Sequence, residues 1–211
     1  MSESVPAAVG APPTNGSERA SDAFVAYVLD LCKVKKTQSD LRTGLGLPVE
    51  RCNYLHRYLV PRLPARMHPD ARRAHYAVAA LIAARPRAAR EADAAGSVQP
   101  WPEWYQRANL GAALAQAVNK QIIKPGSAEG DLHLMARQSS GALHPRLPAL
   151  TRHLLTEGVA VDWAVLLEDL AWWNRDRDRI ATRWLEAYFR TTAPEPEQDP
   201  AARPSHLTEE N

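Results

Sequence analysis

The sequence contains few of the residues that build disulfide scaffolds, sheets or membrane spans. Among 211 residues there are two cysteines, Cys32 and Cys52, and two phenylalanines, and the longest apolar run lies around residues 77–84. Two cysteines exclude a disulfide-rich secreted scaffold, and the apolar run is too short to cross a bilayer. We therefore expect a cytoplasmic protein that has no export signal and no membrane association.

Glycine and proline, at 10 and 17 residues, are too few and too aperiodic for a collagen-like or low-complexity chain. The 45% hydrophobic and 24% charged content is ordinary for a globular protein that buries a core. Because 36 alanines stand against two phenylalanines, the composition favours helix over sheet. The predicted fold class is all-α.

The formal net charge of +2 hides an uneven distribution along the chain. Residues 1–22 and 193–211 have no apolar periodicity and net charges of −2 and −4, so we predict two disordered tails. Residues 33–90 hold 13 Lys and Arg against three acidic residues, a net charge of +10, whereas residues 91–192 have −1. We predict a two-lobed helical bundle, with a basic lobe over 23–125 and a C-terminal lobe over 126–192.

Clustered cations favour a polyanionic partner, because meeting phosphates releases condensed counterions. Arginine outnumbers lysine 21 to 5, which suits bidentate phosphate contacts. A GC-rich genome produces the same bias, so only the clustering counts as evidence.

Apolar residues that recur at i+3 and i+4 predict helices over 22–34, 48–59, 69–84, 103–123, 131–140, 145–156, 163–174 and 176–191. Ser21 and Asp162 are the expected N-caps of the first and seventh of these. The segments 39–46, 85–100 and 125–130 are predicted as turns or loops. Small Gly111 in mid-helix is expected to let another helix approach closely.

Several basic side chains stand where they suit phosphate contacts. Lys33, Lys35 and Lys36 follow the first predicted helix, where they either bind a partner or interact with the helix dipole. Arg72 and Arg73 lie in the first turn of the helix predicted over 69–84. A cation there opposes the dipole, which makes these two better functional candidates than lysines at a helix C-terminus.

Arginine and aromatic side chains alternate on one face of the helix predicted over 48–59. Arg51, Tyr54 and Tyr58 stand at i, i+3 and i+7, with Arg57 beside them. This face either stacks exposed bases and holds a backbone, or its tyrosines pack under a neighbouring helix. Trp172 likewise points away from the apolar face of its helix, so it either packs on a third helix or marks a partner surface.

The chemistry of an enzyme has little support in the sequence. There is no nucleophile motif, Gly-rich phosphate loop or HExxH motif, and we expect neither catalysis nor a cofactor. Cys52 and His56 are one helical turn apart but make only two metal ligands. Glu168 and Asp169 point about 100° apart on a helix, so they form no acid/base pair. The alternating charges of residues 175–179 are typical of solvated ion pairs.

Four segments of the chain have a characteristic order and spacing. They are Leu41-Arg42-x-Gly44-Leu45-Gly46, Asn109-Leu110-Gly111-Ala112-Ala113-Leu114, Gly158-Val-x-Val161-Asp162-Trp163-x-x-Leu166-Leu167-x-Asp169-Leu170-x-x-Trp173, and Trp184-x-x-x-Tyr188. Together, over residues 23–190, the sequence resembles CasB, the small subunit of the type I-E CRISPR Cascade complex.

The resemblance implies an all-α protein without enzymatic activity that acts in antiviral defence. Members of the CasB family are present as two copies beside the backbone and large subunits of the crRNA-containing complex. The implied partners are therefore that complex, a second copy of the chain, and the target and displaced non-target DNA strands. Basic surface residues would help hold the strands of the R-loop while base pairing supplies specificity.

Arg42 lies in a matched segment and is the strongest single candidate, with a salt bridge to Asp40 or Glu50 as its alternative role. Where the family often has a Glu-Arg-Arg-Phe-like stretch, residues 131–137 keep only Arg137 as a basic residue. The complete set of candidate nucleic-acid contacts is Lys33, Lys35, Lys36, Arg42, Arg51, Arg57, Arg72, Arg73, Arg137, Arg146 and Arg152.

One alternative is a helical interaction module whose basic half docks an acidic protein without binding nucleic acid. A helix-turn-helix regulator is less well supported, because no tight turn is followed by a helix that begins with base-reading Asn, Gln or Arg.

Overall fold

The computed structural model describes residues 19–95 and 103–192. Within these ranges every regular element is a helix, which confirms the predicted all-α class. The segment 193–211, predicted to be a tail, and most of 1–22 lie outside the described residues. The division into lobes at residue 125 stays a prediction.

The α-helices are α1 (Ala20–Leu31), α2 (Lys35–Arg42), α3 (Asn53–Leu59), α4 (Pro69–Ala83), α5 (Arg87–Ala95), α6 (Leu110–Asn119), α7 (Pro125–Ala136), α8 (Ser140–Leu143), α9 (Leu147–Thr156) and α10 (Trp163–Thr192). Short 3-10 turns lie between them: η1 (Val49–Arg51), η2 (Val60–Arg62), η3 (Trp104–Gln106) and η4 (His144–Arg146).

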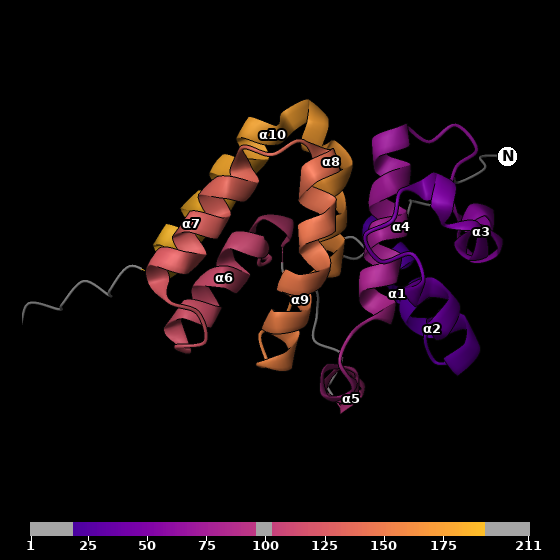
Figure 1. Cartoon of the computed structure of the whole chain (residues 1–211), viewed down its shortest axis with the longest axis horizontal. Coiled ribbons are helices and arrows are strands. Elements are labelled where there is room, and N and C mark those ends of the chain that lie inside the picture. The colour runs from indigo at the N-terminus through magenta and orange to yellow at the C-terminus, as the bar shows by residue number, and fades with distance from the viewer. Residues whose placement is uncertain (1–18, 96–102, 193–211) are drawn as a thin grey trace, which may run out of the picture.

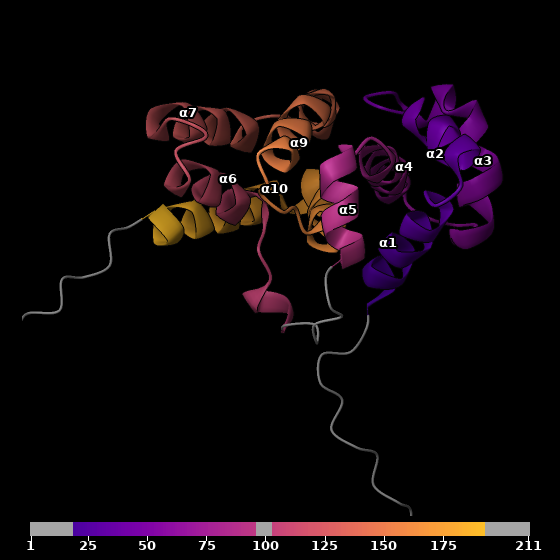
Figure 2. The ribbon, with the colours of Figure 1, turned by 90° about the horizontal axis from the view of Figure 1, so that it is seen from below.

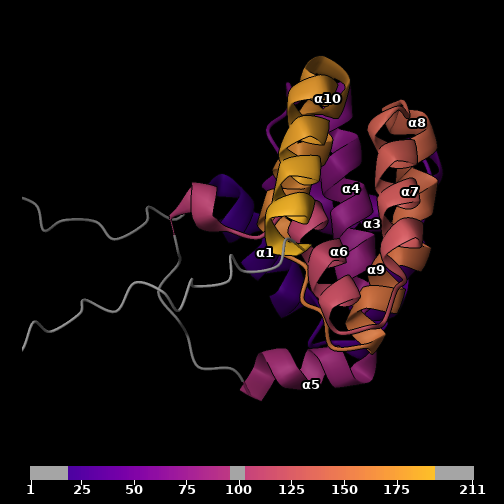
Figure 3. The same ribbon diagram turned by 90° about the vertical axis from the view of Figure 1, so that its left-hand side faces the viewer.

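The long helix α10 is the scaffold that joins the rest of the structure. Helices α1 and α4 pack against it, and so do α6 and α7. The N-terminal helices α1–α4 gather on one side of the molecule and α6–α9 on the other, as Figures 1 and 2 show. Helix α5 lies across one end of this arrangement, next to α9 (Figure 3). The helices of both sides are therefore held in one frame by α10.

The tryptophans of α10 form the centre of the core. Trp173 and Trp184 are fully buried, and their ring centroids lie 4.8 Å apart. The indole N–H of Trp173 donates to the backbone carbonyl of Gln138 at 2.9 Å, so its one polar group is satisfied. These positions confirm the predicted apolar faces of residues 163–174 and 176–191. Among the described residues, no helix is long and apolar enough to span a bilayer.

A close crossing of α6 and α10 depends on Gly111. A Cβ placed on Gly111 would lie 1.8 Å from the backbone oxygen of Trp184. The backbones therefore approach to a distance that only glycine permits, which confirms the role predicted for this residue.

Buried ion pairs tie the start of α1 to the start of α10. The Arg107 guanidinium lies 2.7 Å from Asp22 in the first turn of α1 and 2.7 Å from Asp162. Asp162 also accepts from the backbone N–H groups of Ala164 and Val165 at 3.1 Å, which confirms it as the N-cap. Ser21, in contrast, lies inside α1, where its hydroxyl donates to Glu168 at 2.8 Å, so the prediction that it caps the helix was wrong.

Two segments predicted as turn or loop are helical. The polar α2 forms because Leu41 is fully buried in the core and α2 packs against α4. Helix α5 replaces the loop predicted from residue 85, with an Arg87–Glu91 ion pair of 2.6 Å at i, i+4 on its exposed face. Tertiary packing and side-chain pairing therefore outweigh weak apolar periodicity here.

Proline and a kink change two other boundaries. Pro125 occupies a first-turn position of α7, where its missing N–H costs nothing, so the helix begins there and not at residue 131. The two C-terminal helices predicted separately are one helix, α10, with non-helical backbone angles at Asp176. The helix predicted over 103–123 is shorter, because Asn109 caps α6 by accepting from the N–H of Ala112 at 3.1 Å.

The Gly111 contact predicts the effect of adding a methyl group. Gly111→Ala should destabilise the fold by about 1–3 kcal/mol, because the methyl group meets backbone that cannot move aside. Gly130→Ala in α7, where a Cβ would have nothing within 4 Å, should instead stabilise by about 0.5–1 kcal/mol. Urea unfolding of both variants measures this, and a Gly111→Ala protein as stable as the parent would contradict the close crossing.

Candidate nucleic-acid interface

Exposed cations without acidic partners gather on α2, η1 and α3. Arg42 ends α2, Arg51 lies in η1 and Arg57 in α3, and all three are exposed. Helix α2 packs against both α3 and α4, and η1 also packs against α4, so these side chains come from one group of neighbouring elements. Within the described residues, no carboxylate lies within ion-pair distance of any of the three.

Asp40, two residues before Arg42, is already engaged. Asp40 accepts a 2.7 Å hydrogen bond from the hydroxyl of Tyr58 and lies 3.9 Å from Lys36. Neither Asp40 nor Glu50 forms the salt bridge to Arg42 that was the alternative role of this arginine, within the part of the chain that the structure describes. The Arg42 guanidinium is therefore available to an anionic partner.

Of the two tyrosines of α3, one is exposed as base stacking requires and the other is packed against neighbouring residues. Tyr54 is 60% exposed and lies one turn before Arg57, as a base-stacking side chain would. Tyr58 is half-buried, bonded to Asp40 and with the Arg57 guanidinium 5.8 Å from its ring centroid. Only Tyr54 is therefore presented to a partner.

The predicted lysines occupy the connection between α1 and α2. Lys33 forms an exposed ion pair with Asp30 at 2.9 Å, so its ammonium group is less available to a phosphate than an unpaired one. Lys35 and Lys36 stand in the first turn of α2, so they begin a helix as well as following one.

Arg72 and Arg73 are half-buried in α4 and differ from the exposed group. Arg72 donates to the backbone carbonyl of Ala65 at 3.4 Å. Arg73 reaches α8, where its Nη1 lies 3.9 Å from the position that a Cβ on Gly141 would take. Burial, and after it the charge of Arg73, lower the pKa of His144 to about 4. Arg73 therefore faces the interior junction of α4 and α8.

The second group of candidates lies on the side of the molecule formed by α6–α9, and one of its members is close to the basic N-terminal side. Arg137, Arg146 and Arg152 are exposed at the end of α7, in η4 and on α9. A hollow of about 280 Å³ is lined both by Arg152 and by Leu45, three residues after Arg42. The structure thus brings the turn that follows α2 close to α9, which sequence spacing did not indicate.

Of the five cations in the basic stretch that were not singled out from the sequence, Arg62 and Arg66 lie on the surface that follows α3. Arg66 is exposed with no ion-pair partner among the described residues, and Arg62 lies with its guanidinium 4.7 Å from the ring centroid of Tyr27. The net charge of residues 33–90 was the only signal that could have found them.

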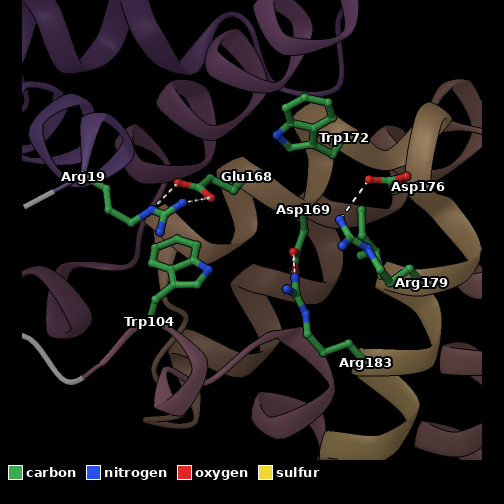
Figure 4. Close-up of a pocket in the computed structure, with 9 residues that line it drawn as sticks. Arg19, Trp104, Glu168, Asp169, Trp172, Asp176, Arg179 and Arg183 are labelled. Carbon is green, nitrogen blue, oxygen red and sulfur yellow. Dashed lines mark hydrogen bonds and ion pairs between the residues drawn. The ribbon is translucent and has the colours of Figure 1, made fainter. Parts of the chain in front are cut away.

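A cleft at the kink of α10 contains paired charges and two indoles. Its volume is about 510 Å³, and Figure 4 shows Trp104 and Trp172 at its edges with three arginines each beside a carboxylate. The pairs are Arg19 with Glu168 at 3.0 Å, Arg179 with Asp176 at 2.9 Å, and Arg183 with Asp169. Trp172 is 49% exposed, so the alternative in which it packs under a third helix was wrong. Because its charges are compensated, this cleft is less suited to a polyanion than α2–α3.

The pair Cys52 and His56 makes contacts that hold the backbone. The Cys52 thiol donates to the carbonyl of Pro48 at 3.3 Å, and His56 Nδ1 lies 2.8 Å from the carbonyl of Cys52. In the described ranges, no group of three or more His, Cys, Asp or Glu side chains is placed to hold a metal ion.

Both the sequence and the fold are similar to those of known CRISPR-associated proteins. The family model of the CRISPR-associated protein Cse2 matches residues 37–189. A solved chain described as "CRISPR RNA-guided surveillance complex" is 36% identical with a TM-score of 0.69, covering 82% of this chain and 93% of its own length. A second solved chain, described as "CRISPR RNA-guided surveillance complex, pre-nicking", is 37% identical with a TM-score of 0.73 and covers 82% of this chain and 93% of its own length.

The crystal structure of M. ruber CasB, at 23% identity, shares the fold with a TM-score of 0.67 over 83% of this chain and 95% of its own. No curated protein matches the sequence. The matches define the class as CRISPR-associated proteins. Within that class the chain belongs to the Cse2 family, and the predicted resemblance to CasB, the small subunit of type I-E Cascade, is confirmed.

Asp169 in the α10 cleft predicts a pH dependence of stability. Burial raises its pKa to about 6, although Arg183 and the Trp184 indole N–H favour the ionised form. Because the folded protein binds this proton more tightly than the unfolded chain, stability due to Asp169 is present below pH 4 and lost as pH rises to about 6. Relative to Asp169→Asn, the parent should lose about 3 kcal/mol over that range.

Urea unfolding of both proteins at pH 4 and pH 7 isolates this group from other titrating residues, since only the difference between them is used. If the stability of the parent relative to the Asp169→Asn variant increases as pH rises, the ion pair with Arg183 outweighs burial.

Proposed function

We propose that the chain is a non-catalytic small subunit of a crRNA-guided type I-E surveillance complex and that its basic helices bind nucleic-acid backbones without reading sequence. The observation that carries the proposal is the exposed group Arg42, Arg51 and Arg57, none of which has an acidic partner among the described residues. Cations left without carboxylates are free to release counterions from phosphates.

The similarity to chains of solved surveillance complexes supports the same role. Two of those chains are 36% and 37% identical to this one over 82% of its length. In such a complex, base pairing between guide and target supplies specificity, and strand exchange is nearly balanced energetically. Sequence-independent contacts to the target strand or the displaced strand would shift that balance toward the open R-loop. The proposed partners are the other subunits, both DNA strands and a second copy of the chain, in the cytoplasm.

The aromatic content of the surface adds a second kind of contact. Exposed Tyr54 stands between Arg51 and Arg57 along the chain. A base that is unpaired in the R-loop could stack on its ring while the arginines hold the backbone. This combination suits single-stranded nucleic acid as well as duplex.

Replacing the three arginines tests the proposal in the isolated chain. Arg42→Ala/Arg51→Ala/Arg57→Ala should weaken binding equally for different sequences and reduce the slope of log affinity against log salt by up to about 3. Fluorescence anisotropy on a duplex of about 20 base pairs, between roughly 50 and 200 mM salt, measures both quantities.

The matched control removes three exposed arginines that already have carboxylate partners, Arg87, Arg177 and Arg190, with the same change in net charge. It should change the slope little. An equal loss of DNA affinity in both triple variants would contradict the assignment of the site. If the parent does not bind DNA at low salt, the alternative in which the chain docks an acidic protein is favoured.

The same variants test the role in the assembled complex. The Arg42/Arg51/Arg57 variant should shorten the lifetime of the R-loop on matched target DNA, since fewer backbone contacts oppose its collapse. Permanganate footprinting of unpaired thymines over time measures this lifetime. An unchanged lifetime in a complex that contains the variant at full stoichiometry would overturn the R-loop role.

A further inference from the structure

A second surface of the molecule combines an apolar floor with a basic rim. A groove of about 520 Å³ lies between the α6–α7 connection, α7 and α9. Its apolar lining includes Ile122, Ile123, Met135 and Leu150, of which only Met135 is fully buried. Lys124, Arg146 and His153 stand around it with a single acidic residue, Asp131. The groove therefore suits a segment that is both apolar and acidic.

The backbone before the groove is held in a strained conformation. Gln121 has a φ of +61°, which is uncommon for any residue other than glycine and costs on the order of 1–2 kcal/mol. The turn directs the N–H groups of both Ile122 and Ile123 to the carbonyl of Ala117, at 2.9 and 3.4 Å. This strained turn therefore precedes two isoleucines that pack against the core but stay only half-buried.

The described chain ends near the α6–α7 connection, which forms one edge of this groove. The side-chain amide of Asn119 donates to the carbonyl of Thr191 at 2.9 Å, and the hydroxyl of Tyr188 donates to the carbonyl of Pro125 at 3.1 Å. In Figure 1 the C-terminal end of α10 overlaps the start of α7, and Figure 2 shows that α6 lies between them. Residues 193–211 therefore begin close to the connection that carries Ile122 and Ile123.

Residues 193–211 have the composition that the groove requires. They contain five acidic residues against one arginine, and Leu207 is their only large apolar residue, followed at once by Thr208, Glu209 and Glu210. From Thr192 to Leu207 the chain can span at most about 50 Å, which is ample for a groove near its origin. A tether of this length also gives a high effective concentration.

We propose that residues 193–211 bind back into this groove, with Leu207 against Ile122, Ile123 and Leu150 and with Glu209 and Glu210 against Lys124 and Arg146. Because Arg146 is one of the candidate nucleic-acid contacts, the bound segment competes with phosphates for it. This competition rests on the proposed function, whereas the docking itself does not.

Paramagnetic broadening in the full chain tests the docking. A spin label on Ser205→Cys is selective, because Cys32 and Cys52 are buried. It should broaden the methyl resonances of Ile122, Ile123 and Leu150. Glu209→Lys/Glu210→Lys should abolish the broadening, and adding Lys124→Glu/Arg146→Glu should restore it. Absence of broadening in the parent overturns the docking, and so does broadening that appears only between labelled and unlabelled molecules, which would indicate a second copy.

Leu207→Ser tests the competition without changing the charge. The affinity for a duplex of about 20 base pairs should rise by up to about tenfold, the limit if the segment fills the groove in nine molecules of ten. Ala201→Ser, the matched control in the same segment, should leave affinity unchanged. Equal affinities for all three proteins overturn the competition, while no DNA binding by any of them overturns the proposed function and leaves the spin-label result to decide the docking.

Discussion

The buried guanidinium of Arg107 is the interaction on which the arrangement of the helices depends. With a side chain only 4% exposed, it lies between Asp22 of α1 and Asp162, the N-cap of α10. Removal of one partner from a buried pair costs about 3–5 kcal/mol, because the remaining charge is left uncompensated. Here a single cation is bonded to two carboxylates from different parts of the chain, so α1 and α10 are held together at their N-terminal ends.

This anchor positions the surface on which the proposed function rests. Helix α4 packs against α10, α2 and η1 pack against α4, and α3 packs against α2. The short helices α2 and α3 contribute only Leu41, Leu55 and Leu59 to the fully buried core, which leaves the rest of their surfaces to polar and charged side chains. A rigid hydrophobic frame can therefore present arginines that have no structural partner, as backbone binding requires.

The sequence predicted those features that depend on local pattern. Strong apolar periodicity located α4 and most of α10, and Asp162 was a correct N-cap because capping needs only neighbouring backbone. Helices α2 and α5 were missed because their apolar periodicity is weak. The ion pairs of Arg107 were missed because its partners are distant in sequence, Asp22 by 85 positions and Asp162 by 55. The closeness of Arg152 to Leu45, in the turn after α2, likewise follows from packing alone, as does the half-burial of Arg73.

The central claim is that α2, η1 and α3 lie against nucleic acid in the assembled complex. Exchange of exposed Tyr54 for the photoreactive residue benzoylphenylalanine, which has a similar shape, tests it directly. Irradiation of the complex on target DNA should covalently join this position to a DNA strand or to the crRNA. The same residue at exposed Tyr105 on η3, remote in sequence from the basic stretch, provides the comparison. Crosslinking of position 54 to protein subunits alone would contradict the account.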